Sequence, residues 1–412
     1  MSMTIRKAFK FRLNPHSDQI QMMVKFAGAN RFVWNKALAM NLFRLDNKQP
    51  LMWYQELAFW LVHWKRSEDF GFLATAPSQT LQQTLKNLDR AFKDTFDKNK
   101  PPKRIPRFKK KGSSSSFRYP QGYKLEQGSN RVFLPKIGWV KYRNSRQVEG
   151  DVKNVTVSRR GSHWYVSIQT EYQVAKPLHP ASSIVGIDLG VTQFATLSDG
   201  KLMMPEHPEK LKQLEAMLAF WQRKLSRKVK FSANWRKVKD KIARIHERIA
   251  NSRNDFLHKT STALSKNHAM MVVEDLKIRN MSASAKGDVT HPGRNVKAKS
   301  GLNKSILSQG WGLFVQMLEY KQVWLGGDVL RVDPKYTSQT CPCCGHVSKD
   351  NRLKQAQFRC VSCYYSNHAD IVGAINILAR GHRVLACGVD ALATSLKQEP
   401  AGRCEAYPLL SA

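Results

Sequence analysis

The sequence predicts a multidomain α+β protein in which helices interrupt an antiparallel β module and an α/β domain follows. The chain has 412 residues, which corresponds to two or three domains at about 150 residues each. Strand-like and helix-like segments are grouped separately up to residue 180 and alternate after it, as expected for an α/β sheet. Two Cys-x2-Cys motifs interrupt this second part, which indicates an inserted metal-binding module.

The N-terminal part begins with a strand and continues with helices. Residues 3–13 alternate apolar and basic side chains, a pattern typical of a half-exposed strand. Residues 17–98 carry apolar side chains at helical spacing, shown most clearly by Leu81, Leu85, Leu88, Phe92 and Phe96. Alternating strands return between residues 117 and 180. We therefore expect a β-barrel that includes the first strand and is split by a helical-bundle insertion.

A basic segment separates these helices from the returning strands. Residues 98–122 hold four Pro, a basic run and four consecutive Ser, a composition that does not form a packed core. Cations interleaved with aromatic rings suit phosphate contacts and base stacking on RNA. The residues concerned are Arg107, Phe108, Lys109, Lys110, Phe117 and Tyr119. A solvated linker is the alternative.

The part after residue 180 alternates strands and helices. The stretches "SIVGIDLG", "MMVVEDL" and "GDVLRVDP" predict buried strands, and an aromatic-rich helix precedes the third. Residues 206–265 predict a very basic helical hairpin, which either contacts the backbone of a nucleic-acid duplex or is only solvated. Residues 381–412 contain no long periodic segment, so we expect a loosely ordered tail.

The Cys-x2-Cys motifs predict a zinc site. They are separated by fifteen residues and supply Cys341, Cys344, Cys360 and Cys363. Four thiolates close a tetrahedral Zn²⁺ site, and a closed site is structural because it leaves no position for water. Cys343 forms only a Cys-x-Cys pair, a poorer chelating loop, and is expected to be a non-ligand. His346 and His368 are expected to be polar neighbours.

Three acidic residues stand at the ends of predicted elements. Asp188 and Glu274 end two buried strands, and Asp370 opens an amphipathic helix. A carboxylate at the edge of an apolar run is costly to bury unless something pairs with it, and Mg²⁺ prefers such oxygen ligands. Each acid alone also fits an ordinary role, as a turn residue, a solvent-facing acid or a helix cap. Together they predict a site for two Mg²⁺ ions that hydrolyses a phosphodiester.

The charge balance indicates a polyanionic partner. Lys and Arg number 68 against 31 acidic residues, which gives a net charge of +37. This excess of cations favours binding to nucleic acid, because neutralising its phosphates releases counterions. The sequence has no apolar run of about 18 residues and no signal-peptide pattern, so we expect a cytoplasmic protein with no membrane partner.

Several motifs resemble those of one family. The stretches "GIDLG", "VVEDL" and "HADIVGAINIL" resemble, in this order, the three motifs of a RuvC-type nuclease of the RNase H fold. Together with the four-cysteine module, "RFVWNKAL", "PSQTLQQTLKNLDRAF", "PRFKKKGSSSSFRYPQ" and "LPKIGWVK", they resemble the TnpB family over about residues 3–380. The resemblance implies a DNA endonuclease guided by an RNA from its own transposon. It also implies cleavage of double-stranded DNA beside a short motif, by one chain per guide RNA.

The resemblance also implies roles for particular residues. Asp188, Glu274 and Asp370 would bind catalytic Mg²⁺, and the four cysteines would bind structural Zn²⁺. The helix that carries Ser78, Gln79, Gln82 and Gln83 would read the motif beside the target, since Gln amides can bond base edges; a polar helix face is the alternative. Tyr364 stands where the family has Gly, and Val372 and Gly373 stand where it has Asn and Ala.

The implied architecture is a split β-barrel (the wedge) with a helical insertion, then an RNase H-like (RuvC) α/β domain with an inserted C4 zinc module. The expected boundaries are 1–16 and 117–180 for the wedge, 17–98 for the helical recognition insertion, 99–116 for the basic linker, 181–336 and 368–380 for RuvC with its hairpin at 206–265, 337–367 for the zinc module, and 381–412 for the tail.

An RNA-guided repressor with an impaired nuclease and a guide-independent RuvC nuclease are the alternative functions. A transposase that joins strands through Tyr would call for a His-x-His pair, which the sequence lacks.

Overall fold

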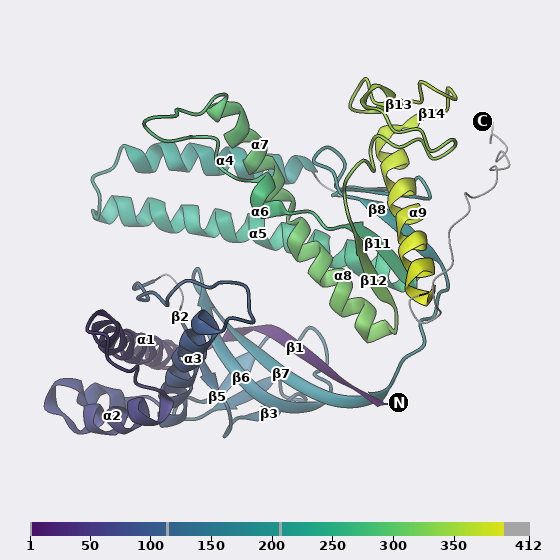
Figure 1. Cartoon of the computed structure of the whole chain (residues 1–412). Coiled ribbons are helices and arrows are strands. Elements are labelled where there is room, and N and C mark those ends of the chain that lie inside the picture. Colours follow the sequence, from purple (N-terminus) through teal and green to yellow (C-terminus); the bar gives the residue numbers. More distant parts are fainter. Residues whose placement is uncertain (1, 113–114, 206–207, 391–412) are drawn as a thin grey trace. The chain divides into compact units, whose positions relative to one another are not determined.

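The chain folds into two compact units in a computed structural model that describes residues 2–112, 115–205 and 208–390 (Figure 1). The first unit comprises Met1–Ala175 and Phe220–Glu247, and the second comprises Lys176–Ala219 and Arg248–Ala412. The long helices α4 (Pro208–Ser226) and α5 (Ala233–Asn267) each contribute to both units. They overlap the range predicted as a very basic helical hairpin, and its bounds stay a prediction.

The first unit contains a seven-stranded sheet in the order β2-β6-β7-β1-β5-β4-β3. Its strands are β1 (Ser2–Asn14), β2 (Ser115–Tyr119), β3 (Lys124–Glu126), β4 (Arg131–Leu134), β5 (Gly138–Tyr142), β6 (Asp151–Arg160) and β7 (His163–Ala175). β1 pairs along its length with β7 and at its end with β5, so the first strand does join the returning strands. The order ends at β2 and β3, and closure into a barrel stays a prediction.

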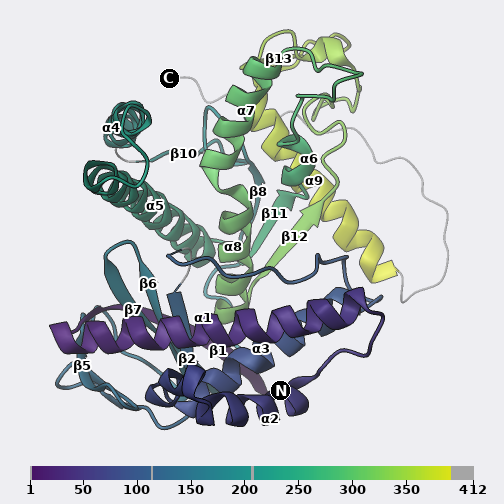
Figure 2. The same cartoon turned by 90° about the vertical axis from the view of Figure 1, so that its left-hand side faces the viewer.

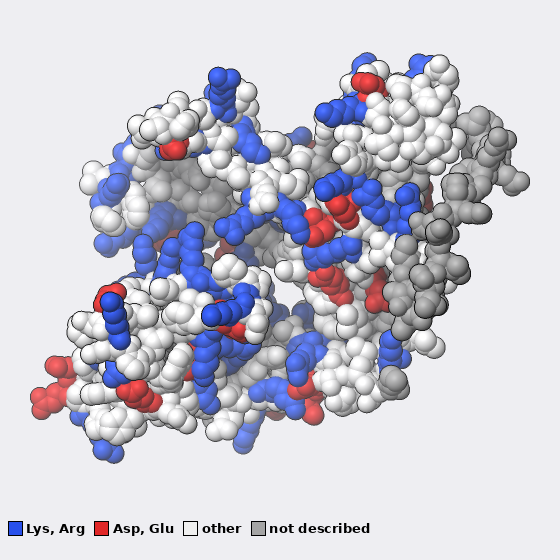
Figure 3. Space-filling view, viewed as in Figure 1, with Lys and Arg blue, Asp and Glu red and all other residues white. Residues whose placement is uncertain are grey.

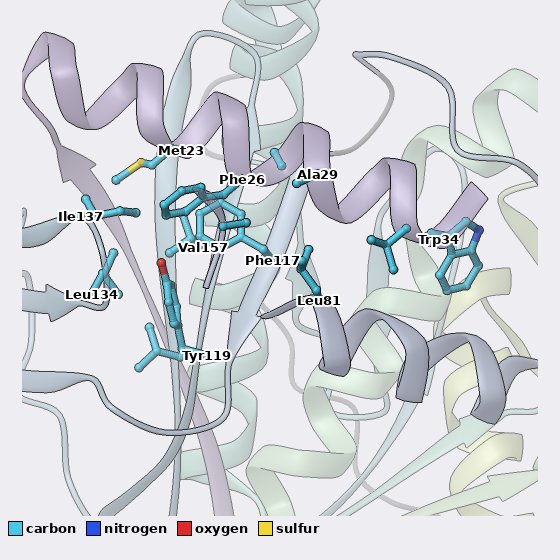
Figure 4. Close-up of a cluster of buried hydrophobic side chains, with 14 of the residues drawn as sticks. Met23, Phe26, Ala29, Trp34, Leu81, Phe117, Tyr119, Leu134, Ile137 and Val157 are labelled. Atoms are coloured by element: carbon cyan, nitrogen blue, oxygen red, sulfur yellow. The ribbon is translucent and has the colours of Figure 1, made fainter. Parts of the chain in front are cut away.

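Helices are inserted between β1 and β2, as expected. They are α1 (Ser17–Asp46), α2 (Tyr54–Arg66), the short 3₁₀ segment η1 (Glu68–Thr75) and α3 (Ser78–Phe96). Figure 4 shows their apolar side chains meeting those of the sheet: Met23 of α1 lies near Ile137, and Phe26 of α1 lies against Phe117. Helices and sheet therefore share one hydrophobic core.

The prediction that Phe117 and Tyr119 stack on RNA is wrong. Both belong to β2, where Phe117 is 3% exposed and Tyr119 0% exposed. The ring of Phe117 meets that of Phe26 edge-on at 5.9 Å, and the Tyr119 hydroxyl donates to the carbonyl oxygen of Pro135 at 3.2 Å. Alternate residues of a strand face the same side, so the two rings enter the core together although Ser residues precede them.

The second unit contains a five-stranded sheet in the order β10-β9-β8-β11-β12. Its strands are β8 (Ile184–Asp188), β9 (Ala195–Leu197), β10 (Leu202–Met203), β11 (Met270–Glu274) and β12 (Asp328–Val332). β8, β11 and β12 are parallel to one another, whereas β9 and β10 are added in antiparallel pairing. The predicted α/β organisation is thus present, because the parallel strands are connected through helices.

Helices cover both faces of this sheet. The remaining helices of the unit are α6 (Ile278–Met281), α7 (Val296–Gln309), α8 (Trp311–Leu325) and α9 (Ala369–Asp390). Met271 and Val273 of β11 belong to the cluster that contains residues of α8, whereas Val272 between them belongs to the cluster that contains Ile377 of α9. Figures 1 and 2 show α8 and α9 on opposite sides of the strands.

Two glycines allow α9 to lie directly on the sheet. A Cβ at Gly186 of β8 would lie 2.2 Å from the carbonyl oxygen of Ala374, and a Cβ at Gly381 would lie 2.5 Å from Cγ2 of Val272. The expected start of the tail at residue 381 is therefore wrong, since α9 continues through Gly381 to Asp390. The expectation for residues 391–412 lies outside the described residues. Within the described part, no helix is long and apolar enough to cross a membrane.

Candidate active site and metal centre

The three predicted acids lie at one end of the parallel strands of the second unit. Asp188 is the last residue of β8, and Glu274 is the last residue of the adjacent strand β11. The register pairs Ile187 with Val273, so the two acids follow at the same level. Asp370 lies in the first turn of α9. Ligands of open α/β sheets bind at the carboxyl ends of the strands, and this is where the acids stand.

Electrostatics indicates that the three carboxylates are close together. Burial, followed by the negative charges of Glu274 and Asp370, raises the pKa of Asp188 to about 7. Burial also raises the pKa of Glu274. Gly373 of α9 lies against the first acid, since a Cβ there would be 3.0 Å from Oδ2 of Asp188. An acid whose pKa is raised by neighbouring carboxylates is stabilised in its ionised form by a cation beside it, and an all-oxygen set suits Mg²⁺.

Glu274 is held by a residue that the sequence did not single out. The hydroxyl of Thr337 lies 2.6 Å from Oε1 of Glu274 and donates to it. The side-chain amide of Asn376 on α9 donates to the carbonyl oxygens of Thr337 and Thr340, at 2.8 and 2.7 Å. The turn that precedes the first Cys is therefore tied to α9 and positions a donor for the acid. Thr337 was missed because its role depends on a contact with a residue 63 positions away.

A cation also reaches the acids. Nη2 of Arg352 lies 3.2 Å from Oδ1 of Asp370. The charge of Arg352 also acts to lower the pKa of Asp188, against the larger effects of burial and the neighbouring acids. Arg352 belongs to the segment between the two Cys pairs. It was missed because one arginine among 68 basic residues carries no signal of its own.

The four predicted cysteines form one cluster. The Sγ atoms of Cys341, Cys344, Cys360 and Cys363 all lie within 4.8 Å of one another. The Sγ atoms of Cys341 and Cys363 are 3.6 Å apart, as are those of Cys344 and Cys360. A tetrahedral Zn²⁺ with its usual sulfur distance would hold sulfurs roughly 3.8 Å apart. The group fits zinc, and Cys343 is exposed and not a member of it.

Two similar turns build the cluster. The amide of Gly345 donates to the carbonyl of Cys341 at 3.0 Å, and the amide of Tyr364 donates to the carbonyl of Cys360 at 3.1 Å. Both turn residues are left-handed, with φ of 75° for Gly345 and 60° for Tyr364. The strands β13 (Gln357–Arg359) and β14 (Ser366–His368) form a hairpin around the second turn, and η2 (Lys349–Asn351) follows the first.

The first turn of α9 connects the thiol cluster with the acids. Val372 is buried together with Cys341, Cys360, Phe358 and Ala369. Its neighbour Gly373 lies against Asp188. The two departures from the family pattern therefore have different surroundings. The valine packs the Cys-containing segment on the helix, and the glycine leaves room for a carboxylate.

The residues expected to contact nucleic acid lie in the first unit. Gln82 and Ser78 are exposed at the start of α3, Ser78 accepts a hydrogen bond from Lys65 at 2.5 Å, and Gln83 donates to Asn87 at 3.0 Å. Oε1 of Gln79 is buried and has no hydrogen-bond partner among the described residues.

The basic segment is docked on α1 rather than fully solvated. The indole of Trp34 donates to the carbonyl of Arg107 at 3.1 Å, and Asn35 exchanges hydrogen bonds with the backbone of Lys109 at 3.1 and 2.8 Å. Nζ of Lys109 lies 3.8 Å from the centre of the Trp34 ring, and burial lowers the pKa of this lysine. Phe108 and Lys110 are exposed.

Comparison with known proteins gives matches along the chain. Family models match residues 167–285 ("Probable transposase", IS605 OrfB), 311–377 ("Cas12f1-like, TNB domain") and 1–47 ("Helix-turn-helix domain"). "Putative RNA-guided DNA endonuclease InsQ" of Escherichia coli is 55% identical over 96% of this chain and 97% of its own length. A "Putative RNA-guided DNA endonuclease" of Streptomyces pristinaespiralis is 33% identical over 100% of both chains. A solved Cas12f1–sgRNA–target DNA complex aligns at 13% identity with a TM-score of 0.49 and covers 91% of this chain and 98% of that one. On the strength of the first two relatives, the chain belongs to the TnpB family of IS605 OrfB proteins.

Proposed function

We propose that this protein is a DNA endonuclease guided by an RNA from its own transposon, cleaving double-stranded DNA beside a short motif. One observation carries the proposal: Asp188 ends a buried strand, and its pKa is raised to about 7 by burial and by the charges of Glu274 and Asp370. The names of the relatives that are 55% and 33% identical support the same activity.

The proposed chemistry is RuvC-type, metal-dependent hydrolysis of a phosphodiester. Asp188, Glu274 and Asp370 would hold two Mg²⁺ ions. Bound Mg²⁺ would supply an activated water and stabilise the leaving oxygen. The carboxylates provide the negative charge that such ions require, and the Thr337 hydroxyl fixes the orientation of Glu274. Arg352 brings a positive charge beside Asp370, where it offsets the charge of the acids and suits a phosphate.

The remaining parts of the chain would hold the nucleic acids. Lys and Arg predominate over acidic residues on the face shown in Figure 3, in keeping with the net charge of +37. We assign the sheet of the first unit to a wedge-like domain, α1–α3 to recognition of the target-adjacent motif, and the second unit to the nuclease domain. One chain would act with one guide RNA, and the four-cysteine group would hold a structural Zn²⁺.

Cleavage by acid variants tests the proposal. RNA that co-purifies with the protein is sequenced, and the loaded protein is given target DNA and Mg²⁺. Asp188→Ala is expected to abolish cleavage and to retain DNA binding, since it removes a metal ligand and leaves the basic surface intact. Asp199→Ala is the matched control, because Asp199 pairs with Lys201 on the same unit away from the acids.

Three results would contradict this function. Cleavage that persists in Asp188→Ala would remove the acids from the mechanism. Cleavage by RNA-free protein at the same sites would identify a guide-independent nuclease instead. An inactive wild-type protein that still binds the target through its RNA would favour the repressor alternative.

A further inference from the structure

The first unit contains a cavity that the proposed chemistry does not use. It has a volume of about 740 Å³ and lies between the turn that joins β6 to β7 and the beginning of α5. Its lining includes two aromatic residues, Phe231 and Trp235, and five cationic ones: Arg159, Arg160, Arg236, Lys239 and Arg244. Asp240 is the one acidic residue in this lining. The size falls within the range of about 300–1,000 Å³ typical of ligand sites.

Phe231, which lines this cavity, has a backbone conformation that is rare for a bulky residue. It precedes α5 in the left-handed conformation, with φ of 69°, and is 71% exposed. A bulky side chain rarely adopts this conformation, and strained residues cluster at binding sites. Packing of the ring into a core does not account for this backbone conformation, since the ring is mostly exposed to solvent. The ring centres of Phe231 and Trp235 are 5.5 Å apart with an angle of 53° between the planes, so an exposed aromatic corner is held in place.

The wall of the cavity is fixed on the sheet by one carboxylate. Glu247 of α5 accepts a hydrogen bond from the Tyr165 hydroxyl at 3.0 Å and lies 3.6 Å from Nδ1 of His163. A Cβ at Gly161 would lie 2.7 Å from the same carboxylate, so the β6–β7 turn approaches α5 closely. All of these residues belong to the first unit. The aromatic corner and the turn arginines are therefore positioned before any ligand binds.

We propose that this cavity binds one unpaired nucleotide of the RNA partner, with the base stacked on Phe231 or Trp235 and its phosphates held by the arginines. Aromatic rings beside cationic side chains are typical of sites that bind single-stranded nucleic acid. A base in a duplex has both faces covered, so stacking on these rings requires a nucleotide that is splayed out, as in RNA loops and bulges. The proposal rests on the proposed function, in which RNA is the constituent that can fold into such loops.

Binding measurements with the co-purifying RNA test the proposal. At least one of Phe231→Ala and Trp235→Ala is expected to weaken RNA binding about tenfold, the loss of one stacked base, and the variant that does so identifies the ring on which the base stacks. The slope of affinity against salt should stay the same in both, because no phosphate contact is removed. Trp235→Phe should retain most of the affinity. Arg244→Gln should reduce both the affinity and the salt slope.

Tyr364→Ala is the matched control, since Tyr364 is an aromatic residue that is 69% exposed, lies in the Cys-containing segment and does not line the cavity. It should bind RNA like the wild type. Crosslinking followed by mass spectrometry should place an RNA adduct on Phe231 or Trp235. Equal RNA affinity of the Phe231→Ala, Trp235→Ala and wild-type proteins would overturn the proposal. So would a loss that appears only with single-stranded DNA.

Failure of the proposed function is distinguishable from failure of this site. If no defined RNA co-purifies and cleavage requires none, the guide-dependent function fails. The cavity is then judged with short homopolymer RNA oligonucleotides, by quenching of tryptophan fluorescence in wild type and in Trp235→Phe. Quenching that disappears in Trp235→Phe supports the cavity, and quenching that persists unchanged contradicts it.

Discussion

At the residue scale, the electrostatics of Asp188 fits the proposed cation site. Burial and the charges of Glu274 and Asp370 raise the pKa of Asp188 to about 7, from an ordinary value of 3.8. The folded protein without metal therefore binds more protons than the unfolded chain between these two values. Its stability falls as the pH rises through this window, because ionising Asp188 in the fold is costly.

Asp188→Asn should therefore stabilise the metal-free protein. In buffer without Mg²⁺ at about pH 8, we expect the melting temperature of its unit to rise by roughly 3 °C or more. The gain should shrink toward about pH 5, where Asp188 is protonated in the fold. Calorimetry measures both values, with Asp199→Asn as the control. An equal gain at both pH values would show that ionisation of Asp188 is not the cause.

Thr337 offers a second test at this scale. Thr337→Val keeps the shape of the side chain but removes the donor to Glu274. Partners that orient metal ligands are typically worth about 10–100-fold in metal affinity, so the Mg²⁺ concentration for half-maximal cleavage should rise about tenfold. Thr340→Val, which removes a hydroxyl that donates to the carbonyl of Tyr336, should leave it unchanged. An unaltered Mg²⁺ requirement in Thr337→Val would contradict the role of this hydroxyl.

At the element scale, the position of α9 depends on its close approach to β8. Gly186→Ala would place a methyl group 2.2 Å from the carbonyl of Ala374, so the helix must move. Overpacking of this kind costs up to about 3 kcal/mol, and we expect a loss near that value in chemical denaturation, together with loss of cleavage. Gly301→Ala on α7, which meets no atom within 4 Å, should instead stabilise by up to about 1 kcal/mol. If Gly186→Ala is as stable as the wild type, the helix does not rest on this strand.

The second Cys turn carries a strain that the first turn avoids. Tyr364 has φ of 60° where Gly345 has 75°, and a left-handed conformation costs a non-glycine residue roughly 1–2 kcal/mol. Tyr364→Gly should stabilise the folded turn and slow the release of zinc to a chelator about fivefold. Gly345→Ala should accelerate the release. Faster release from Tyr364→Gly would instead show that losing the contact between the Tyr364 ring and Arg359, at 5.8 Å, outweighs the relief of strain.

At the scale of the whole molecule, α9 contacts both the four-cysteine group and the proposed acid site. Val372 of α9 packs with the cysteines, and Asp370 and Gly373 belong to the acid site. Removing zinc should therefore abolish cleavage through the displacement of Arg352 and Asp370. RNA binding by the first unit should persist. Removal of zinc with a chelator, followed by cleavage and RNA-binding assays, separates the two effects. Full cleavage by protein shown to be zinc-free would contradict this coupling.

Much of the fold could be predicted from local patterns. Helical and alternating spacing identified the inserted helices, the basic hairpin and most strands, because burial of one face imposes a period on neighbouring residues. The spacing of the cysteines predicted the cluster. The position of Asp188 and Glu274 after apolar runs predicted that they end strands.

The sequence by itself thus determined the family, the helices, most strands and the four-cysteine group. Each of these depends on short motifs or on the spacing of residues that are close together in the chain. Only the tertiary structure decided which side chains meet. It buried Phe117 and Tyr119, brought Thr337 and Arg352 to the acids, and extended α9 beyond Gly381. These outcomes depend on contacts between residues far apart in the sequence, and local composition does not encode such contacts.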